Sequence, residues 1–235
     1  MIEDPVQSTS PALLKENLAS RLKEAIMDGR LAPGHRVVEG FWAREFGAAQ
    51  ASVREAINLL ISDGFLVKDS GRSARVVDYS EAAVAHVYEV RGVLEALAAQ
   101  RAAATGADLS AVAQALSAME QAAECGDMRA LIENDFRFHT ALAEASGNPV
   151  LVEMTTRLLA PLFAFTLLRV IKSGQGPGPW AKDLGKHHRI LELIREGNPP
   201  LAAKYVEHAV NRFAAAAYRV WSNEAMAPSP EEGGD

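Results

Sequence analysis

Residues 50–60 read QASVREAINLL, and this stretch decides the fold of the first third of the chain. Its apolar side chains recur at positions i, i+3, i+4 and i+7, the spacing of one buried helical stripe. That stripe comprises Val53, Ala56, Ile57 and Leu60. Gln50, Arg54 and Asn58 follow one another four residues apart on another face. A short helix that packs by one stripe and offers polar and basic groups on the other suits the major groove of DNA.

The surrounding segments predict a winged helix-turn-helix over residues 10–79. Before the recognition helix, which we place at 49–63, the pattern predicts a helix from Pro11 to about Asp28, a Pro33-Gly34 turn and a short helix over 39–46. After it, two short apolar runs flank Gly71-Arg72-Ser73 and indicate a small β-hairpin, the wing.

Beyond Tyr79 the β signals end, and long alanine- and leucine-rich periodic stretches follow. Short breaks separate them, which predicts an antiparallel all-helical bundle over 80–226. We expect its helices at about 81–104, 109–125, 128–146, 149–171, 180–196 and 199–224. The tail, 227–235, is rich in Pro, Glu and Gly and is expected to be disordered. The predicted fold class is therefore mainly α.

Charge and cysteine content narrow the function. The net charge is -6, and residues 11–79 carry ten Lys or Arg against nine Asp or Glu, so DNA contacts must come from the placement of cations. Cys125 is the only cysteine, which excludes an internal disulfide and a zinc finger. No apolar run approaches the ~18–20 residues of a membrane span, and no signal peptide is evident. We expect a cytoplasmic protein without membrane contact.

Basic side chains around the recognition helix are candidate DNA contacts. Arg44 precedes that helix, while Lys68, Arg72 and Arg75 belong to the wing, where they could reach phosphates or a minor groove. Each arginine alone is as well explained as a solvated surface charge. The first 79 residues could also be a packing or protein-interaction module, but the cluster of cations favours DNA.

A second group of polar residues lies in the helical part. Asp135 and His139 are four apart on one helical face, and His187 and His208 lie on two later helices. A carboxylate and three imidazoles on three helices could converge on one divalent metal, for which zinc, nickel, manganese or iron is suitable. His187 shares its face with an apolar stripe, whereas His188 should face water. The alternative is that these are ordinary hydrogen-bonded core histidines.

The amino-terminal part resembles the GntR-type bacterial transcription regulators. The resemblance rests on residues 22–26 (LKEAI), 29–31 (GRL), 33–34 (PG), 53–56 (VREA) and 63–67 (DGFLV). It implies a DNA-binding repressor or activator that acts as a homodimer on a palindromic operator, with Arg54 keeping the DNA role of the family arginine.

The chain departs from this family just before the VREA motif. The family's Ser-Arg-x-Pro is here Ala49, Gln50, Ala51 and Ser52, so a capping serine is lost. Gln50 replaces an arginine that in the family reads a guanine, and glutamine prefers the edge of adenine. We therefore predict an operator half-site that differs from the family's common one. The expected DNA-binding residues are Arg44, Gln50, Ala51, Ser52, Arg54 and Arg72.

The helical part resembles the FCD effector domain of the FadR-like GntR branch. The resemblance rests on residues 135–139 (DFRFH), 142–143 (LA) and 146–149 (SGNP), and on the later histidines. It implies that the metal ligands are Asp135, His139, His187 and His208, with zinc as the first candidate. It also implies that Arg91 lies near the effector pocket, where a guanidinium could clamp a small carboxylate effector. An ordinary ion pair between Arg91 and Glu95 is the alternative.

Three interpretations of these residues compete. The first is a transcription regulator whose operator binding is controlled by a small organic acid bound at the metal site. The second is a metal-dependent hydrolase or lyase using the same Asp and three His residues. A catalytic metal needs a nearby general base, and the sequence offers none in a convincing place. An enzyme would also leave the winged module unexplained, so we expect no catalytic residues. A third possibility is a metal or polar network that only stabilises the bundle.

Overall fold

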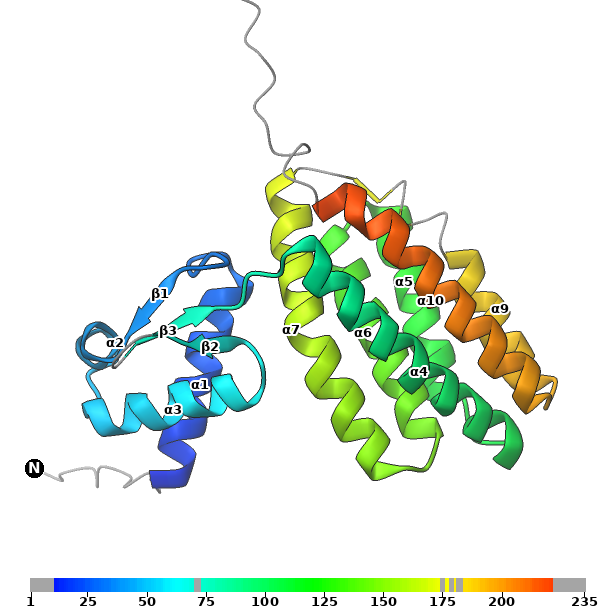
Figure 1. Cartoon of the computed structure of the whole chain (residues 1–235), viewed down its shortest axis with the longest axis horizontal. Helices are drawn as coiled ribbons and strands as arrows, with labels where there is room; N and C mark the ends of the chain where they lie inside the picture. Colours follow the sequence, from blue (N-terminus) through cyan, green and yellow to red (C-terminus); the bar gives the residue numbers. More distant parts are fainter. Residues whose placement is uncertain (1–10, 70–72, 174–175, 178–179, 181–183, 222–235) are drawn as a thin grey trace, which may run out of the picture. The chain divides into compact units, whose positions relative to one another are not determined.

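The computed structural model describes residues 11–69, 73–173, 176–177, 180 and 184–221. The chain divides into two compact units, Met1–Asp78 and Tyr79–Asp235, each considered by itself (Figure 1). The fold class is mainly helical with one small antiparallel sheet, as predicted.

The described residues of the first unit form three helices and a three-stranded sheet (Figure 1). The helices are α1 (Pro11–Met27), α2 (Glu39–Phe46) and α3 (Gln50–Ser62). The strands β1 (Arg36–Val38), β2 (Leu66–Lys68) and β3 (Ser73–Val76) lie in the order β1-β3-β2, all antiparallel. The β2–β3 hairpin is the predicted wing. β1 was not predicted, because three residues are too short for their alternation to stand out from a turn.

Helix α3 packs by the stripe that its sequence predicts. The buried residues of α3 are Val53, Ala56, Ile57 and Leu60. They face α1, which contributes Leu18 and Leu22 to the same core. No side chain caps the start of α3, because its N-cap residue is Ala49 in extended conformation. The polar face of α3 is therefore held in place by apolar packing on its opposite side.

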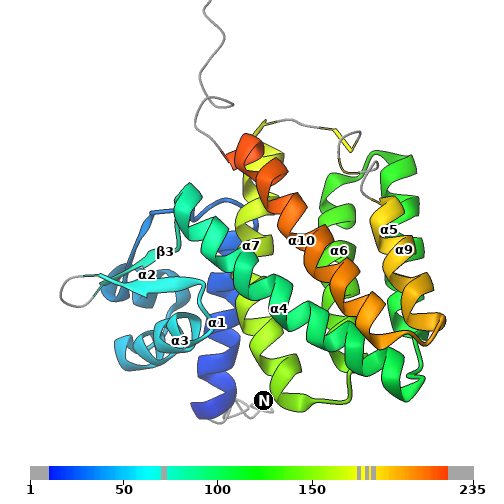
Figure 2. The same cartoon turned by 45° about the vertical axis from the view of Figure 1, so that its right-hand side comes forward.

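The second unit is a helical bundle whose segments follow the predicted pattern. They are α4 (Glu81–Thr105), α5 (Ser110–Cys125), α6 (Met128–Ala145), α7 (Pro149–Ser173), α9 (Leu184–Arg195) and α10 (Pro199–Trp221). Helices α4 and α10 lie side by side in both views (Figures 1 and 2). Gly106 and Gly126 end α4 and α5 with left-handed backbone, which glycine adopts without steric cost.

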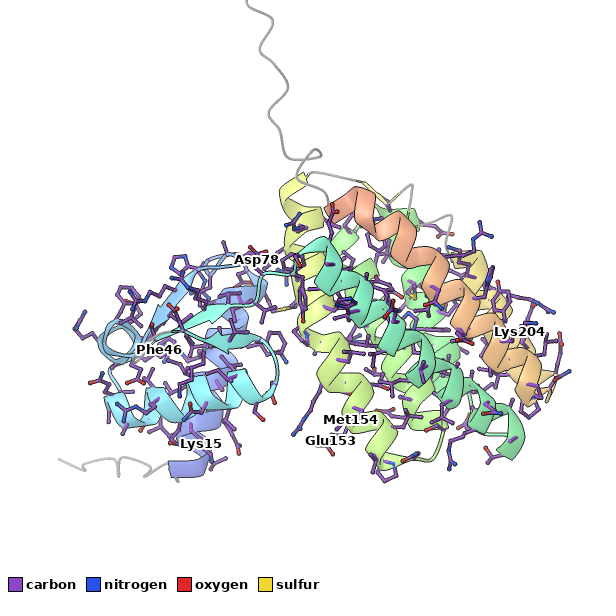
Figure 3. The ribbon with its side chains drawn as sticks, in the orientation of Figure 1. Lys15, Phe46, Asp78, Glu153, Met154 and Lys204 are labelled. Atoms are coloured by element: carbon purple, nitrogen blue, oxygen red, sulfur yellow. The ribbon has the colours of Figure 1, made fainter. Side chains whose placement is uncertain are left out.

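Helix α7 requires a correction to the sequence analysis. Its stretch Pro149–Val170 has 22 residues and a mean hydropathy of 1.5, so by length and composition alone it could cross a membrane. The expectation that no apolar run approaches that length was too strict. Its most apolar window of 18 residues is 56% buried within the protein. Glu153, labelled in Figure 3, is exposed and pairs with Arg157 on the same helix. These features are typical of the core helix of a bundle.

Candidate functional site

The face of the first unit that was predicted to contact DNA is open to solvent. Arg44, Gln50 and Ala51 are exposed, Ser52 is half-buried, and the Arg54 side chain is 45% exposed. Arg72 lies outside the described residues. The other predicted DNA-binding residues thus lie near the start of α3 and on α2. Their contact with DNA stays a prediction.

One buried carboxylate, that of Glu39, contacts two side chains of this face. Glu39 is the first residue of α2 and is 6% exposed. Arg54 donates two hydrogen bonds to it, from Nε to Oε1 at 3.0 Å and from Nη2 to Oε2 at 2.9 Å. Gln50 Nε2 lies 3.5 Å from the same Oε2. The hydrogen bond and charge of Glu39 raise the pKa of Arg54. Sequence reasoning missed Glu39, because the contact joins two helices and leaves no local pattern.

Arg75, one of the two arginines expected on the wing, is held by contacts within its own unit. Its Nε lies 3.1 Å from Asp69 Oδ2, and its Nη1 donates to the carbonyl oxygen of Gly34 at 3.2 Å. Arg36, opposite Arg75 in the sheet, lies 3.6 Å from the same Asp69 oxygen. These contacts fix the base of the wing and use part of the hydrogen-bonding capacity of Arg75.

In the second unit, Asp135, His139 and His187 converge. Asp135 Oδ1 lies 3.1 Å from His139 Nε2 and 3.0 Å from His187 Nε2, and all three atoms lie within 4.8 Å of one another. Asp135 and His139 come from successive turns of α6, while His187 comes from α9. The buried ring of Phe138 packs edge-on against His187 at 4.8 Å and restricts its orientation.

His208 does not join this cluster, so its predicted convergence with the other three residues is wrong. His208 is exposed on α10, whereas Ala209 and Val210 line the cavity beside the cluster. The reason is the register of α10, whose buried stripe continues through Ala202 and Val206 to those two residues. That stripe is visible in the sequence and would have excluded His208. His188 is exposed, as predicted, with Nε2 2.7 Å from Glu120 Oε1.

Behind His139 lies a buried ion pair between Arg91 and Glu95, the predicted alternative for Arg91. Arg91 Nε donates to Glu95 Oε1 at 2.6 Å, and both side chains are almost fully buried. Arg91 Nη2 lies 2.7 Å from His139 Nε2, and the guanidinium also lies over the Phe163 ring. Glu95 Oε2 lies 2.8 Å from His139 Nδ1, although neither atom makes a well-aligned hydrogen bond within the described residues.

The electrostatics of this cluster favour a cation. Burial alone would raise the pKa of Glu95, but the charges of Arg91 and His139 outweigh burial and lower it to about 2. Burial also opposes ionisation of Asp135, yet hydrogen bonds from His139 and His187 hold its pKa well below its usual range. For His139, burial disfavours the charged ring, but Glu95 and Asp135 raise its pKa. Two carboxylates thus face one arginine, and positive charge beside them is stabilised.

The cluster lines a cavity of about 50 Å³. Apolar side chains of Met119, Leu131, Ile132 and Ile190 form much of its wall. Lys186 and Trp180 also line it, and sequence reasoning missed both. Lys186 stands next to His187 in the first turn of α9, and no sequence motif marks either Lys186 or Trp180. The cavity therefore presents two cations, Arg91 and Lys186, beside the Asp and His residues.

Comparison with known families assigns both units. Residues 14–76 match the family described as bacterial regulatory proteins, gntR family, and residues 86–212 match the FCD domain. The FCD match alone covers more than half of the 235-residue chain. The two matches fall on the winged unit and the helical bundle respectively.

Similar proteins are transcription regulators rather than enzymes. The chain is 26% identical over 216 residues to the probable D-xylose utilization operon transcriptional repressor of Paenarthrobacter nicotinovorans, covering 90% of this chain and 92% of that protein. It is 30% identical over 176 residues to the HTH-type transcriptional regulator McbR of Escherichia coli, covering 74% and 79%. The hydrolase or lyase alternative finds no support.

Solved structures agree on the fold. The structure of E. coli McbR/YncC superimposes with a TM-score of 0.73 at 23% identity, covering 89% of this chain and 99% of that one. A putative GntR regulator from Rhodococcus sp. RHA1 gives 0.72 at 23% identity, covering 86% and 96%. Together with the two family matches, these comparisons show that the chain belongs to the GntR family of bacterial transcription regulators and carries an FCD effector-binding domain.

Proposed function

We propose that this regulator holds a divalent metal ion through Asp135, His139 and His187, and that a small carboxylate bound at this centre controls its binding to operator DNA. The observation that carries the proposal is the convergence of one carboxylate oxygen and two imidazole nitrogens within 4.8 Å, beside a buried arginine.

The donor set fits a metal. Ligand bonds of about 2.0–2.2 Å to zinc place neighbouring ligand atoms a little over 3 Å apart. Asp135 Oδ1 has neighbours at 3.0 and 3.1 Å, and the three donors lie within 4.8 Å of one another, so the two imidazoles would have to move closer together to hold one ion. Zinc is the first candidate, and nickel, manganese or iron are alternatives for the same donors. With Ala209 in place of a fourth protein ligand, such a centre keeps open positions.

Glu95 orients the ring of His139 for this task. With its Oε2 2.8 Å from Nδ1, a small rotation aligns a hydrogen bond that places the proton on Nδ1 and leaves the lone pair on Nε2. Buried carboxylates behind metal-bound histidines commonly have this role. Arg91 Nη2 contacts the same nitrogen, Nε2, so the guanidinium end would have to turn aside for a metal ion to be held.

Arg91 then becomes the recognition group for an anionic effector. Its Nε stays on Glu95, while its Nη atoms can turn into the cavity and hydrogen-bond a carboxylate. Lys186 adds a second positive charge on the cavity wall. A bound metal supplies a positive charge and open coordination positions for a carboxylate oxygen. The small cavity volume, about 50 Å³, favours a short organic acid.

On the DNA side, we propose a cytoplasmic homodimer that reads a palindromic double-stranded operator. Two-fold operators require two reading heads at a fixed spacing. An exposed apolar row on α4, formed by Val90, Val93 and Leu97, is the surface we assign to the second copy. Its residues recur at i, i+3 and i+7, so they share one helical face.

The effector acts by preferring one conformation of the dimer. A ligand shifts a conformational equilibrium only by its difference in affinity for the two states. To reverse a population from about 1:99 to 99:1, that difference must be roughly 10⁴-fold. A carboxylate that contacts both the metal and Arg91 only when the guanidinium has turned can supply such a difference.

Metal analysis and DNA binding test this proposal together. The full chain, prepared without an affinity tag, should carry about one metal ion, and Asp135→Ala should remove it. Small carboxylic acids that raise the melting temperature of the wild type should then change its affinity for the DNA upstream of its own gene. Asp135→Ala should still bind that DNA but no longer respond to the acid. An undiminished response in Asp135→Ala would refute the metal-linked mechanism.

A further inference from the structure

We infer that Glu39 is a positioning residue that sets the base preference of the recognition helix, by holding Arg54 and Gln50 in one arrangement before DNA arrives. The inference rests on the proposed operator binding and takes Arg54, one of the predicted DNA contacts, as a base reader. The observation that supports it is that one buried carboxylate on α2 contacts both Arg54 and Gln50 on α3.

Burial makes this contact directional. The Glu39 side chain, 8% exposed, needs hydrogen bonds, because an unpaired buried charge is strongly unfavourable. Arg54 satisfies both oxygens through a bidentate pair, the geometry that fixes a guanidinium most tightly. Glu39 also stands in the first turn of α2, where the helix dipole favours negative charge. The carboxylate is thereby anchored, and Arg54 takes its orientation from it.

The ion pair with Glu39 orients Arg54 but leaves some of its hydrogen-bond donors unused. A guanidinium has five N–H donors, and the bonds to Glu39 use one on Nε and one on Nη2. The remaining donors include the end-on pair formed by Nη1 and Nη2, and the side chain is 45% exposed. Such a pair matches the O6 and N7 acceptors of guanine. Glu39 therefore holds the two Nη donors of Arg54 in a fixed orientation toward the DNA-facing side.

The same carboxylate restricts Gln50. The amide nitrogen of Gln50 faces Glu39 Oε2 at 3.5 Å, so its carbonyl oxygen is directed away from the carboxylate. An exposed carbonyl oxygen accepts from adenine N6 or cytosine N4. Gln50 then selects a base that offers a hydrogen-bond donor. It does not pair with adenine through both its carbonyl oxygen and its amide nitrogen.

Selection of binding sites from random DNA with the full chain tests this inference. The variants are Glu39→Gln, which removes the charge, and Glu39→Asp, which keeps the buried charge but shortens the side chain. Glu45→Gln is the matched control, because it removes an equal charge from the exposed face of the same helix. Arg54→Ala identifies the position in the half-site that Arg54 reads. Thermal melting verifies that each variant is folded.

We expect wild type and Glu45→Gln to select the same half-site. Glu39→Gln and Glu39→Asp should lose roughly tenfold of their discrimination at the position that Arg54→Ala also affects. Should Glu39→Gln not fold, Glu39→Asp decides the matter alone. Unchanged selectivity in a folded Glu39 variant would overturn the positioning role while leaving base reading by Arg54 intact. Unchanged selectivity in Arg54→Ala would instead overturn the proposed role of Arg54, and the inference with it.

Discussion

Arg91 Nη2 and His139 Nε2 lie 2.7 Å apart in the core of the helical unit, so a guanidinium contacts the imidazole nitrogen that a metal ion would need. The same Arg91 is anchored at its Nε by Glu95, which in turn faces the other nitrogen of His139. One arginine therefore links three functions in this unit: the charge balance of the core, the availability of a metal ligand and the recognition of an anion.

Replacing Arg91 by Met should separate these functions. The side chain keeps its apolar contacts, but the donors for a carboxylate are lost, and charge-assisted hydrogen bonds contribute about 1.5–3 kcal/mol each. Effector affinity, measured by titration calorimetry, should fall by at least tenfold while metal content is retained. Arg101→Met removes an arginine from the same helix that instead bonds the Ser146 carbonyl, and should leave effector affinity unchanged. Equal affinities in the two variants would contradict the role of Arg91.

Glu95→Gln should destabilise the helical unit strongly. Removing one member of a buried ion pair leaves its partner uncompensated, at a cost of about 3–5 kcal/mol. Glu95 is 1% exposed and faces both Arg91 and His139. Denaturant unfolding of the metal-free protein would measure this cost. The matched variant is Glu133→Gln, which breaks an exposed pair with Arg129 and should cost less than about 1 kcal/mol. Similar losses in both variants would show that Glu95 is not the anchor of this core.

Ala49→Ser should stabilise the winged unit. Ala49 occupies the N-cap of α3 with φ -63° and ψ 139°, an extended conformation in which a serine oxygen can accept from the first turn of the helix. The gain is expected at about 1 kcal/mol, read as a higher melting temperature of this unit. Ala51→Ser makes the same chemical change two residues later, inside the helix, and should give no gain. A destabilised Ala49→Ser would contradict the capping argument.

Val93→Glu should convert the proposed homodimer to monomers. Val93 is 60% exposed on α4, in the centre of the apolar row assigned to the second copy. A buried charge without a partner opposes association. Val150→Glu is the control, since Val150 is 62% exposed on α7, outside that row. Analytical ultracentrifugation should find Val93→Glu monomeric and Val150→Glu dimeric, with operator affinity reduced only in the former. A dimeric Val93→Glu would remove α4 from the interface.

Local patterns in the sequence predicted most of the fold. The buried stripe of α3 and the long helices of the bundle follow from side-chain periodicity, which is a property of neighbouring residues. The sequence did not predict β1, because its three residues form a strand only through their pairing with β3. Glu39 was missed for a related reason. Its partners Gln50 and Arg54 lie 11 and 15 residues away on another helix.

At the candidate metal centre, a ligand position inferred from family resemblance must be tested against the buried stripe of its own helix. Asp135 and His139 share a helical face by their spacing, and His187 shares one with an apolar stripe, so all three could be predicted to turn inward. His208 was assigned by resemblance, yet the stripe on α10 passes through Ala209 and places His208 on the exposed face. A one-residue difference turns a helical side chain by about 100°, since a helix has 3.6 residues per turn. The register of the helix therefore decides which histidine can be a ligand.

Titration of Zn²⁺ into chelator-treated protein tests the three-ligand centre most directly. We expect wild type and His208→Ala to bind about one ion with the same affinity, because His208 lies outside the cluster. Asp135→Ala should lose more than the roughly 10- to 100-fold that loss of an outer partner of a metal ligand costs. Ala209→His, which places an imidazole on the inward face, should bind more tightly than wild type. Failure of the wild type to bind, or a loss in His208→Ala equal to that in Asp135→Ala, would contradict this centre.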